Sequence, residues 1–171
     1  SASQVEINSG IQFYDGITTA EIQEILIKSA SDLIELESPN YQFVAARLLL
    51  FGVRKKLWGR IHEAPSLGNH ITKCIREGVY DSHFTSKYTD QEIDELDSYI
   101  DHDRDYLFTY AGLRQVTDKY LVQDRSTGDL YETPQFMYIM IAATMFSEYP
   151  KETRLDYVKR YYDAISRHRI N

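Results

Sequence analysis

The chain has 171 residues, of which 43% are hydrophobic and 26% are charged, and its formal net charge is −7. This length and composition are normal for one globular domain with a real core. The negative charge argues against nucleic acid as the main partner, because binding to a phosphate backbone depends on clustered cations. No apolar stretch approaches the roughly 18 residues of a membrane span, and no signal-peptide pattern opens the chain. We therefore expect a cytoplasmic protein with neither nucleic-acid nor membrane partners.

Cys74 is the single cysteine, which excludes an internal disulfide and a dithiol redox pair within this chain. A lone cysteine suits a reducing compartment and is typically a packing or surface thiol. The five histidines lack the i, i+4 spacing beside a glutamate that is typical of zinc sites. We expect no metal site and no catalytic residue in this chain.

The first half of the chain has helical periodicity. Thr18 and Glu21 have the spacing of a capping box, which marks the start of a helix. The apolar face behind it is expected to comprise Ile22, Ile25, Leu26 and Leu33. After Pro39 a second helix is expected, whose shared apolar face comprises Tyr41, Val44, Ala45, Leu48 and Phe51. Its last turns carry the basic triplet 54–56, which either complements the helix dipole and aids solubility or binds a ligand.

The second half predicts further helices after a looser stretch at 59–68. They are expected at about 69–77, from a capping box at Thr89 and Glu92, at about 104–119, from Pro134 to Met145, and after Pro150. A small hairpin is also predicted, with strands at residues 120–122 and 130–131 and a turn at 126–129. The predicted fold class is all-α, a mainly helical domain with one small β-hairpin near residues 120–131.

An acidic cluster lies between two of these helices and comprises Asp97, Asp101, His102, Asp103 and Asp105. Oxygen-rich clusters can bind metal ions, but these side chains follow one another across a helix junction and lack a loop glycine. A solvated helix boundary is the better interpretation. The sequence also contains no glycine-rich phosphate loop and no nucleophile elbow.

Seven stretches, taken in order, resemble one family. They are IQFYDGITT at 11–19, YQFVAARL at 41–48, YIDHDRD at 99–105, KYLV at 119–122 with YETPQF at 131–136, PKETRL at 150–155 and YVKRYYDA at 157–164. Together they resemble the N-terminal region of the bacterial and phage class I ribonucleotide reductase large subunit. Each stretch alone is modest, but the ordered set covers essentially the whole chain.

The resemblance implies two parts. Residues 1–57 look like the C-terminal helices of the ATP-cone, the allosteric module that senses ATP against dATP. Residues 58–171 look like the helical domain that precedes the ten-stranded catalytic barrel. The Lys-Arg-Asp-Gly-like motif of the family's cone is not found in this sequence, and Cys74 matches none of the family's radical-bearing cysteines. The expected role is therefore allosteric and architectural, and the 171-residue chain alone is expected to be inactive.

The same resemblance implies the enzyme and its partners. The parent enzyme reduces ribonucleoside diphosphates to deoxyribonucleotides for DNA synthesis. Its partners would be the remainder of the catalytic subunit with its barrel, a small radical-generating subunit and a second copy in a homodimer. No cofactor is expected in this chain beyond ATP or dATP as effector. Two alternatives stay open: a stand-alone helical interaction module with no nucleotide role, and a naturally split gene product.

Four residues match positions where the family contacts its overall-activity effector: Thr19, Gln23, Phe51 and Lys55. Thr19 and Gln23 are i, i+4 near a helix start, and Phe51 and Lys55 are i, i+4 near a helix end. The aromatic ring would form a wall for the base or ribose, and the ammonium would pair with phosphates. Some family members have histidine where this chain has Gln23. The structural alternative is that Phe51 is a core aromatic residue and Lys55 a surface cation.

Overall fold

The computed structural model of the chain describes residues 2–10, 12–36 and 38–169. Well over half of these residues are helical. In chain order the elements are α1 (Ala2–Gly10), α2 (Thr19–Ser31), α3 (Tyr41–Trp58), α4 (Leu67–Arg76), α5 (Phe84–Lys87), α6 (Asp90–Tyr99), the 3₁₀-helix η1 (His102–Leu107), α7 (Tyr110–Gln115), the π-helical turn η2 (Val116–Tyr120), α8 (Pro134–Met145) and α9 (Lys151–Ser166). The prediction of an all-α fold is confirmed.

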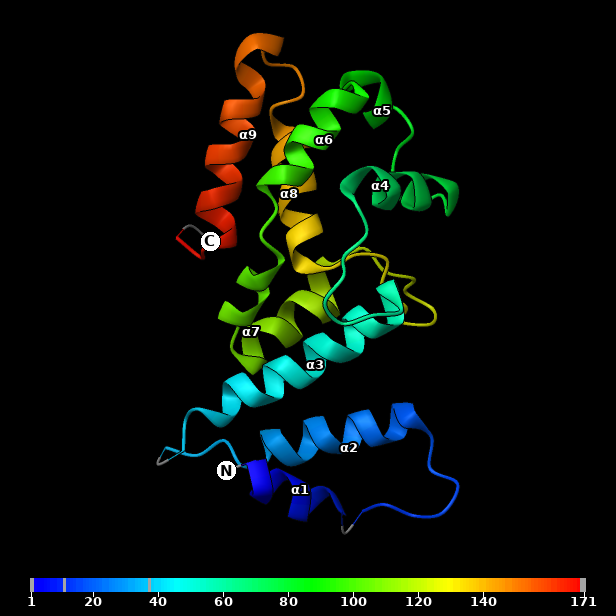
Figure 1. Cartoon of the computed structure of the whole chain (residues 1–171), viewed down its shortest axis with the longest axis vertical. Coiled ribbons are helices and arrows are strands. Elements are labelled where there is room, and N and C mark those ends of the chain that lie inside the picture. The colour runs from blue at the N-terminus through cyan, green and yellow to red at the C-terminus, as the bar shows by residue number, and fades with distance from the viewer. Residues whose placement is uncertain (1, 11, 37, 170–171) are drawn as a thin grey trace.

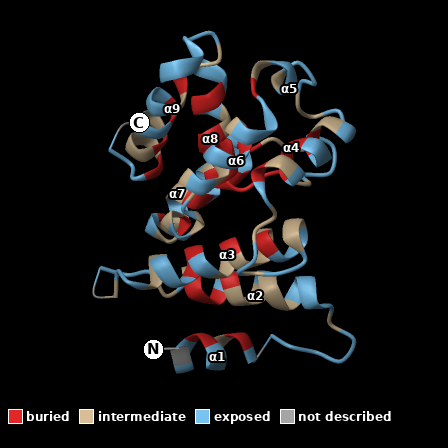
Figure 2. Cartoon of the chain, turned by 45° about the horizontal axis from the view of Figure 1, so that its top comes forward, coloured by how far each residue is buried: buried red, intermediate tan, exposed pale blue. Residues whose placement is uncertain are grey.

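Helix α3 lies between the α1–α2 pair and the remaining helices (Figure 1). On one side it packs against α2, which in turn packs against α1. On its other side α3 packs against α7 and η1, and η1 packs against α8. Helix α8 packs against α9 and is buried along most of its length, so it forms the centre of the larger core (Figure 2).

The predicted helix starts are confirmed where the chain carries its own capping side chain. The Thr18 hydroxyl accepts from the Glu21 N–H at 3.2 Å, and the Glu21 carboxylate accepts from the Thr18 N–H at 2.8 Å. Thr89 and Glu92 form the same reciprocal pair at the start of α6. Such a capping box satisfies two backbone donors that a helix start would otherwise leave open.

The predicted β-hairpin was wrong. The described residues contain no strand, and only an isolated antiparallel bridge joins Gln123 to Leu130. The chain does reverse here, and the Tyr131 and Asp124 N–H groups donate across it to the Val122 and Asp129 carbonyls, but a side chain takes the next donor that a longer ladder would need. The Val122 N–H donates to the Glu132 carboxylate at 2.9 Å, and the Asp124 carboxylate accepts from N–H groups of its own turn. The pairing therefore stops after one bridge.

The predicted helix at about 104–119 was also wrong, because the segment is divided into η1, α7 and η2. Phe108 is extended and ends η1. Thr109 is extended as well, and its hydroxyl accepts from the Gly112 N–H at 3.2 Å, which begins α7 as a new helix. A side-chain cap within an apparently periodic stretch thus interrupts the helix. Helices α1 and α5 were not predicted.

The buried face of α3 differs from the predicted one. Its buried residues are Ala45, Ala46, Leu49, Leu50 and Arg54, while Val44 of the predicted face is 39% exposed. The buried face is rotated relative to the predicted one because α3 is covered by α2 on one side and by α7 and η1 on the other. None of the helices within the described ranges is both long enough and apolar enough to cross a membrane.

Candidate functional site

Gln23 of α2 lies close against α3. Its side-chain Nε2 donates to the Leu48 carbonyl at 2.5 Å. A Cβ added at Gly52 would lie 3.3 Å from Gln23 Cγ, which is tighter than ordinary contact. Glycine is costly inside a helix, so the close approach of α2 gives a physical reason for Gly52. The structure therefore places Gln23 as a bridge between the two helices.

Thr19 and Lys55 lie at the same end of this helix pair. Helices α2 and α3 run in opposite directions (Figure 1), so the turn before Gln23 and the turn after Gly52 lie at one end. Both side chains are exposed. Within the described part of the chain, the Lys55 ammonium makes no hydrogen bond or ion pair, which leaves it available to a ligand; the Lys55 carbonyl accepts from the Gly59 N–H.

The nearby start of α2 already holds a negative charge. The Glu21 carboxylate accepts hydrogen bonds from Thr18 and from the Tyr14 hydroxyl, and these bonds hold the pKa of Glu21 below its usual range. Glu21 therefore satisfies much of the positive end of the α2 dipole. A phosphate bound here would depend on Lys55 more than on the helix start.

Phe51 is half-buried, and its ring contacts come from η1 and from the chain after α3. Its ring meets the edges of His62 and Tyr106, with centroids 6.2 and 6.5 Å apart. The structure thus brings Thr19, Gln23 and Lys55 to one end of the α2–α3 pair, while Phe51 lies on the adjoining face of α3, towards η1.

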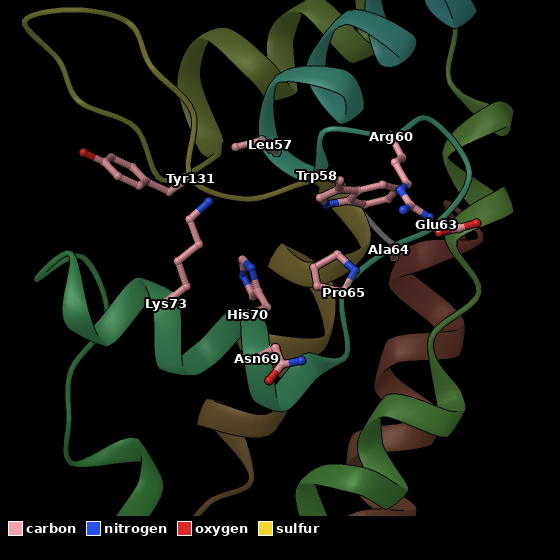
Figure 3. Close-up of a pocket in the computed structure, with 10 residues that line it drawn as sticks. All are labelled: Leu57, Trp58, Arg60, Glu63, Ala64, Pro65, Asn69, His70, Lys73 and Tyr131. Atoms are coloured by element: carbon pink, nitrogen blue, oxygen red, sulfur yellow. Dashed lines mark hydrogen bonds and ion pairs between the residues drawn. The ribbon is translucent and has the colours of Figure 1, made fainter.

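A cavity of about 350 Å³ opens beyond the end of α3 (Figure 3). Trp58 and His70 form part of its wall, and Arg60 and Lys73 border it. Burial lowers the pKa of His70 to about 4, with Lys73 adding to the effect. The cavity therefore combines a neutral imidazole with two cations, of which Arg60 is already paired with Glu63.

A second cavity of about 730 Å³ lies between α8 and the segment 79–87. Apolar side chains make up most of its wall, including Phe84, Met137, Met140 and Ile141. Sequence reasoning found neither cavity, because each is formed by segments far apart in the chain.

Arg54 is the most buried cation of α3, with 1% of its surface exposed. Its Nη2 lies 3.0 Å from Asp105 Oδ2 and donates to the His102 carbonyl, and its Nη1 donates to the Tyr106 hydroxyl at 3.3 Å. The guanidinium also lies over the Trp58 ring, 5.1 Å from the centroid. Arginine suits this position because its planar fork can bind several acceptors at once.

The network continues from η1 into α8 and α9. Gln135 Nε2 donates to Asp105 Oδ1 at 2.9 Å, and the Tyr162 hydroxyl donates to Gln135 Oε1 at 2.7 Å. The Tyr162 oxygen in turn accepts the Asp101 N–H at 2.9 Å. Burial raises the pKa of Asp105 to about 6, while its bonds to Gln135 and Arg54 oppose the rise. Asp105 is therefore still mainly ionised at neutral pH.

This network corrects two interpretations of the sequence. Arg54 is not a surface cation, and Asp105, 1% exposed, does not lie at a solvated helix boundary. A signal for both was present in Gln135, a polar residue within the apolar run of α8. A polar residue on a buried face needs buried partners.

Cys74 lies in the core, 1% exposed. Burial raises the pKa of its thiol to about 11, and the Glu132 carboxylate adds to the effect. A thiol in this state is a poor nucleophile. Across residues 2–10, 12–36 and 38–169, no three histidine, cysteine or carboxylate side chains converge as a metal site would require.

The chain has relatives among known proteins. Residues 106–171, which include α7, α8 and α9, match the family described as "Ribonucleotide reductase, all-alpha domain". The whole chain is 53% identical over 171 residues to the ribonucleoside-diphosphate reductase 1 subunit alpha of Escherichia coli (strain K12). It is 52% identical over 171 residues to the subunit alpha of Haemophilus influenzae and 43% identical over 173 to that of Enterobacteria phage T4.

These matches cover 100% of this chain but only 22 or 23% of each relative. The chain belongs to the ribonucleotide reductase large-subunit family. Within that family it corresponds to the N-terminal, all-alpha region of ribonucleoside-diphosphate reductase alpha subunits, and it spans about a fifth of their length.

Proposed function

We propose that this chain is an allosteric and architectural part of a ribonucleoside-diphosphate reductase, and that α2 and α3 contribute to a site for ATP or dATP. The intact enzyme would reduce ribonucleoside diphosphates to deoxyribonucleotides, the reaction class named for the relatives. The described residues supply no nucleophile for that chemistry, because the one cysteine is buried with a raised pKa. Their role would therefore lie in regulation and in packing.

The observation that supports the effector role is the position of Thr19 and Lys55 at one exposed end of the α2–α3 pair. Gln23 fixes the two helices against each other, and this places the Thr19 hydroxyl and the Lys55 ammonium at one exposed end. Phe51 adds a half-buried ring one turn before Lys55. A cation, a hydroxyl and a ring edge are the groups that bind phosphate, ribose and base.

The test is nucleotide affinity in the intact alpha subunit. Lys55→Ala should weaken ATP and dATP binding by about tenfold or more, since a charge-assisted hydrogen bond contributes roughly 1.5–3 kcal/mol. The fold should survive because Lys55 is exposed. Isothermal titration calorimetry measures both affinities directly.

Lys56→Ala is the matched control. Lys56 is the neighbouring exposed lysine, and its ammonium is paired with Asp129 rather than free. Its removal should change affinity by no more than about twofold, because an exposed pair contributes little. Equal affinities for wild type and Lys55→Ala would withdraw the effector site and leave Lys55 as a dipole-complementing cation.

The proposed partners are the remainder of the catalytic subunit, a small radical-generating subunit and a second copy of the alpha subunit. The word "subunit" in the relatives' names supports a multi-chain enzyme. Ile141 and Met145 beside the second cavity are 38% and 55% exposed, which supports an apolar contact there. An open reading frame that continues from this region into barrel cysteines would separate this proposal from a stand-alone interaction module.

A further inference from the structure

Arg54 occupies a position between two residues of the proposed effector site. On α3 it follows Phe51 by three residues and precedes Lys55 by one, so all three lie within about one helical turn. Phe51 and Lys55 reach the surface of α3, whereas Arg54 points into the protein. The same turn of helix therefore has an outer, ligand-accessible part and an inner part bound to Asp105.

Tyr106 connects the outer part to the inner part. Its ring meets the edge of Phe51 at a centroid separation of 6.5 Å, and its hydroxyl accepts a hydrogen bond from Arg54. Two cations lie over the same ring, with Arg47 Cζ at 5.5 Å and Arg54 Cζ at 5.2 Å from its centroid. A ligand that shifts the Phe51 ring therefore changes the edge contact with Tyr106, the residue that also holds the Arg54 guanidinium.

The inner part ends on two other helices. Asp105 is bound by Gln135 of α8, and Gln135 is bound by Tyr162 of α9. Arg54, Tyr162 and Gln135 are each at most 1% exposed, so water cannot substitute for a lost partner without entering the core. A change at Arg54 is thus expected to alter the hydrogen bonding of both α8 and α9.

We propose that Arg54 is a positioning residue of the effector site, which couples the Phe51 face of α3 to helices α8 and α9 through Asp105, Gln135 and Tyr162. The proposal rests on the effector role of α2 and α3. Its physical basis is a contiguous buried path with a fixed hydrogen-bond order, and such networks can carry coupling between distant sites. Lysine could not replace Arg54, because a single ammonium cannot bind Asp105, a carbonyl and a hydroxyl in the geometry of the guanidinium.

The test is amide hydrogen exchange of the intact alpha subunit with and without ATP. In wild type, ATP should change the exchange of residues 134–145 and 151–166. Arg54→Lys should abolish that ATP-dependent change. If Arg54→Lys does not fold, Gln135→Met interrupts the same path without altering α3, and it should abolish the change in 151–166. ATP affinity in Gln135→Met should shift by about 2- to 30-fold and should remain sensitive to Lys55→Ala.

Tyr88→Phe is the matched control. The buried Tyr88 hydroxyl donates to the Ala143 carbonyl of α8 at 2.6 Å, so its loss weakens α8 outside the proposed path. This variant should exchange faster in general but keep its response to ATP. A purely structural role for Gln135 would instead make the two variants behave alike, and that result would overturn the proposal.

The two proposals fail in different ways. If ATP binds through Lys55 but leaves the exchange of α8 and α9 unchanged, only the coupling role of Arg54 is overturned. If wild-type subunit does not bind ATP, or binds it equally well after Lys55→Ala, the effector site itself is overturned and the coupling role with it.

Discussion

The guanidinium of Arg154 on α9 donates hydrogen bonds to the carboxylate of Glu92 on α6, with Nη2 2.6 and 2.7 Å from the two carboxylate oxygens. Arg154 is only 3% exposed, and it also donates to the Lys87 carbonyl at 2.7 Å and the Ser147 carbonyl at 3.3 Å. Its Cζ lies 4.4 Å from the centroid of the Tyr88 ring. One side chain thus joins α9 to α6, to the last residue of α5 and to the segment after α8.

Arg154→Leu should lower the free energy of unfolding by about 3–5 kcal/mol, because Glu92, whose side chain is only 16% exposed, loses its charged partner and keeps only its bonds from Thr89, while two carbonyls lose a donor. Urea unfolding followed by circular dichroism measures the loss. The control is Arg160→Ala on the same helix, whose pair with Asp156 is 3.8 Å apart and whose side chain is 71% exposed. That change should cost less than about 0.5 kcal/mol. Similar losses in both variants would show that burial does not set the strength of these pairs.

Two glycines should respond to alanine with opposite signs. Gly59 ends α3 with φ +73°, a left-handed conformation, so Gly59→Ala should cost about 1–2 kcal/mol. Gly68 lies in the first turn of α4, where an added Cβ would only touch Ile93 at 3.7 Å. Gly68→Ala should therefore stabilise by about 0.4–1 kcal/mol. Thermal unfolding of both variants checks the signs, and a stabilising Gly59→Ala would contradict the left-handed cap.

Stability should depend on pH through His102. Burial lowers the pKa of His102 to about 4, with the Arg54 charge adding to the effect. The His102 imidazole takes up a proton near pH 6.5 in the unfolded chain but only near pH 4 in the folded chain. The contribution of neutral His102 to the free energy of unfolding is therefore complete above pH 6.5 and is lost as the pH falls to 4. The stability difference between wild type and His102→Gln, which cannot titrate, should shrink by up to about 3 kcal/mol across that range. Parallel curves of stability against pH would contradict it. Asp105 acts in the opposite direction, but both proteins carry it.

The parts of the fold that could be predicted from sequence are those set by neighbouring residues. The capping boxes that begin with Thr18 and Thr89 operate over three residues, so their spacing alone was sufficient. Thr109 shows the limit of this reasoning, since its cap interrupts a stretch whose apolar periodicity continues.

The buried network could not be predicted because its partners are far apart in the chain. Arg54 and Asp105 are separated by 51 residues, and Gln135 lies 30 residues further on. Each has an ordinary local explanation as a helix-end cation, a loop acid or a polar helix residue. Of the candidate effector residues, spacing gave the i, i+4 pairs, but only the packing of Gln23 against Gly52 shows which ends of the helices meet.

Cys74 should be inert while the chain is folded, and the 171-residue chain alone should not reduce ribonucleotides. A thiol whose pKa is about 11 has roughly a hundredfold less thiolate at pH 8 than an ordinary one, and the thiolate is the reactive form. Cys74 is also 1% exposed, with Sγ 3.8 Å from the Tyr131 carbonyl, so a reagent must wait for the core to open. Ellman's reagent should therefore modify the native chain at least about a hundredfold more slowly than the chain in urea.

With a radical-generating subunit and a dithiol reductant, the same preparation should form no deoxynucleotide, since reduction through thiol chemistry requires several convergent cysteines. Rapid modification of the native thiol would contradict its burial, and any deoxynucleotide formation would contradict the allosteric and architectural role.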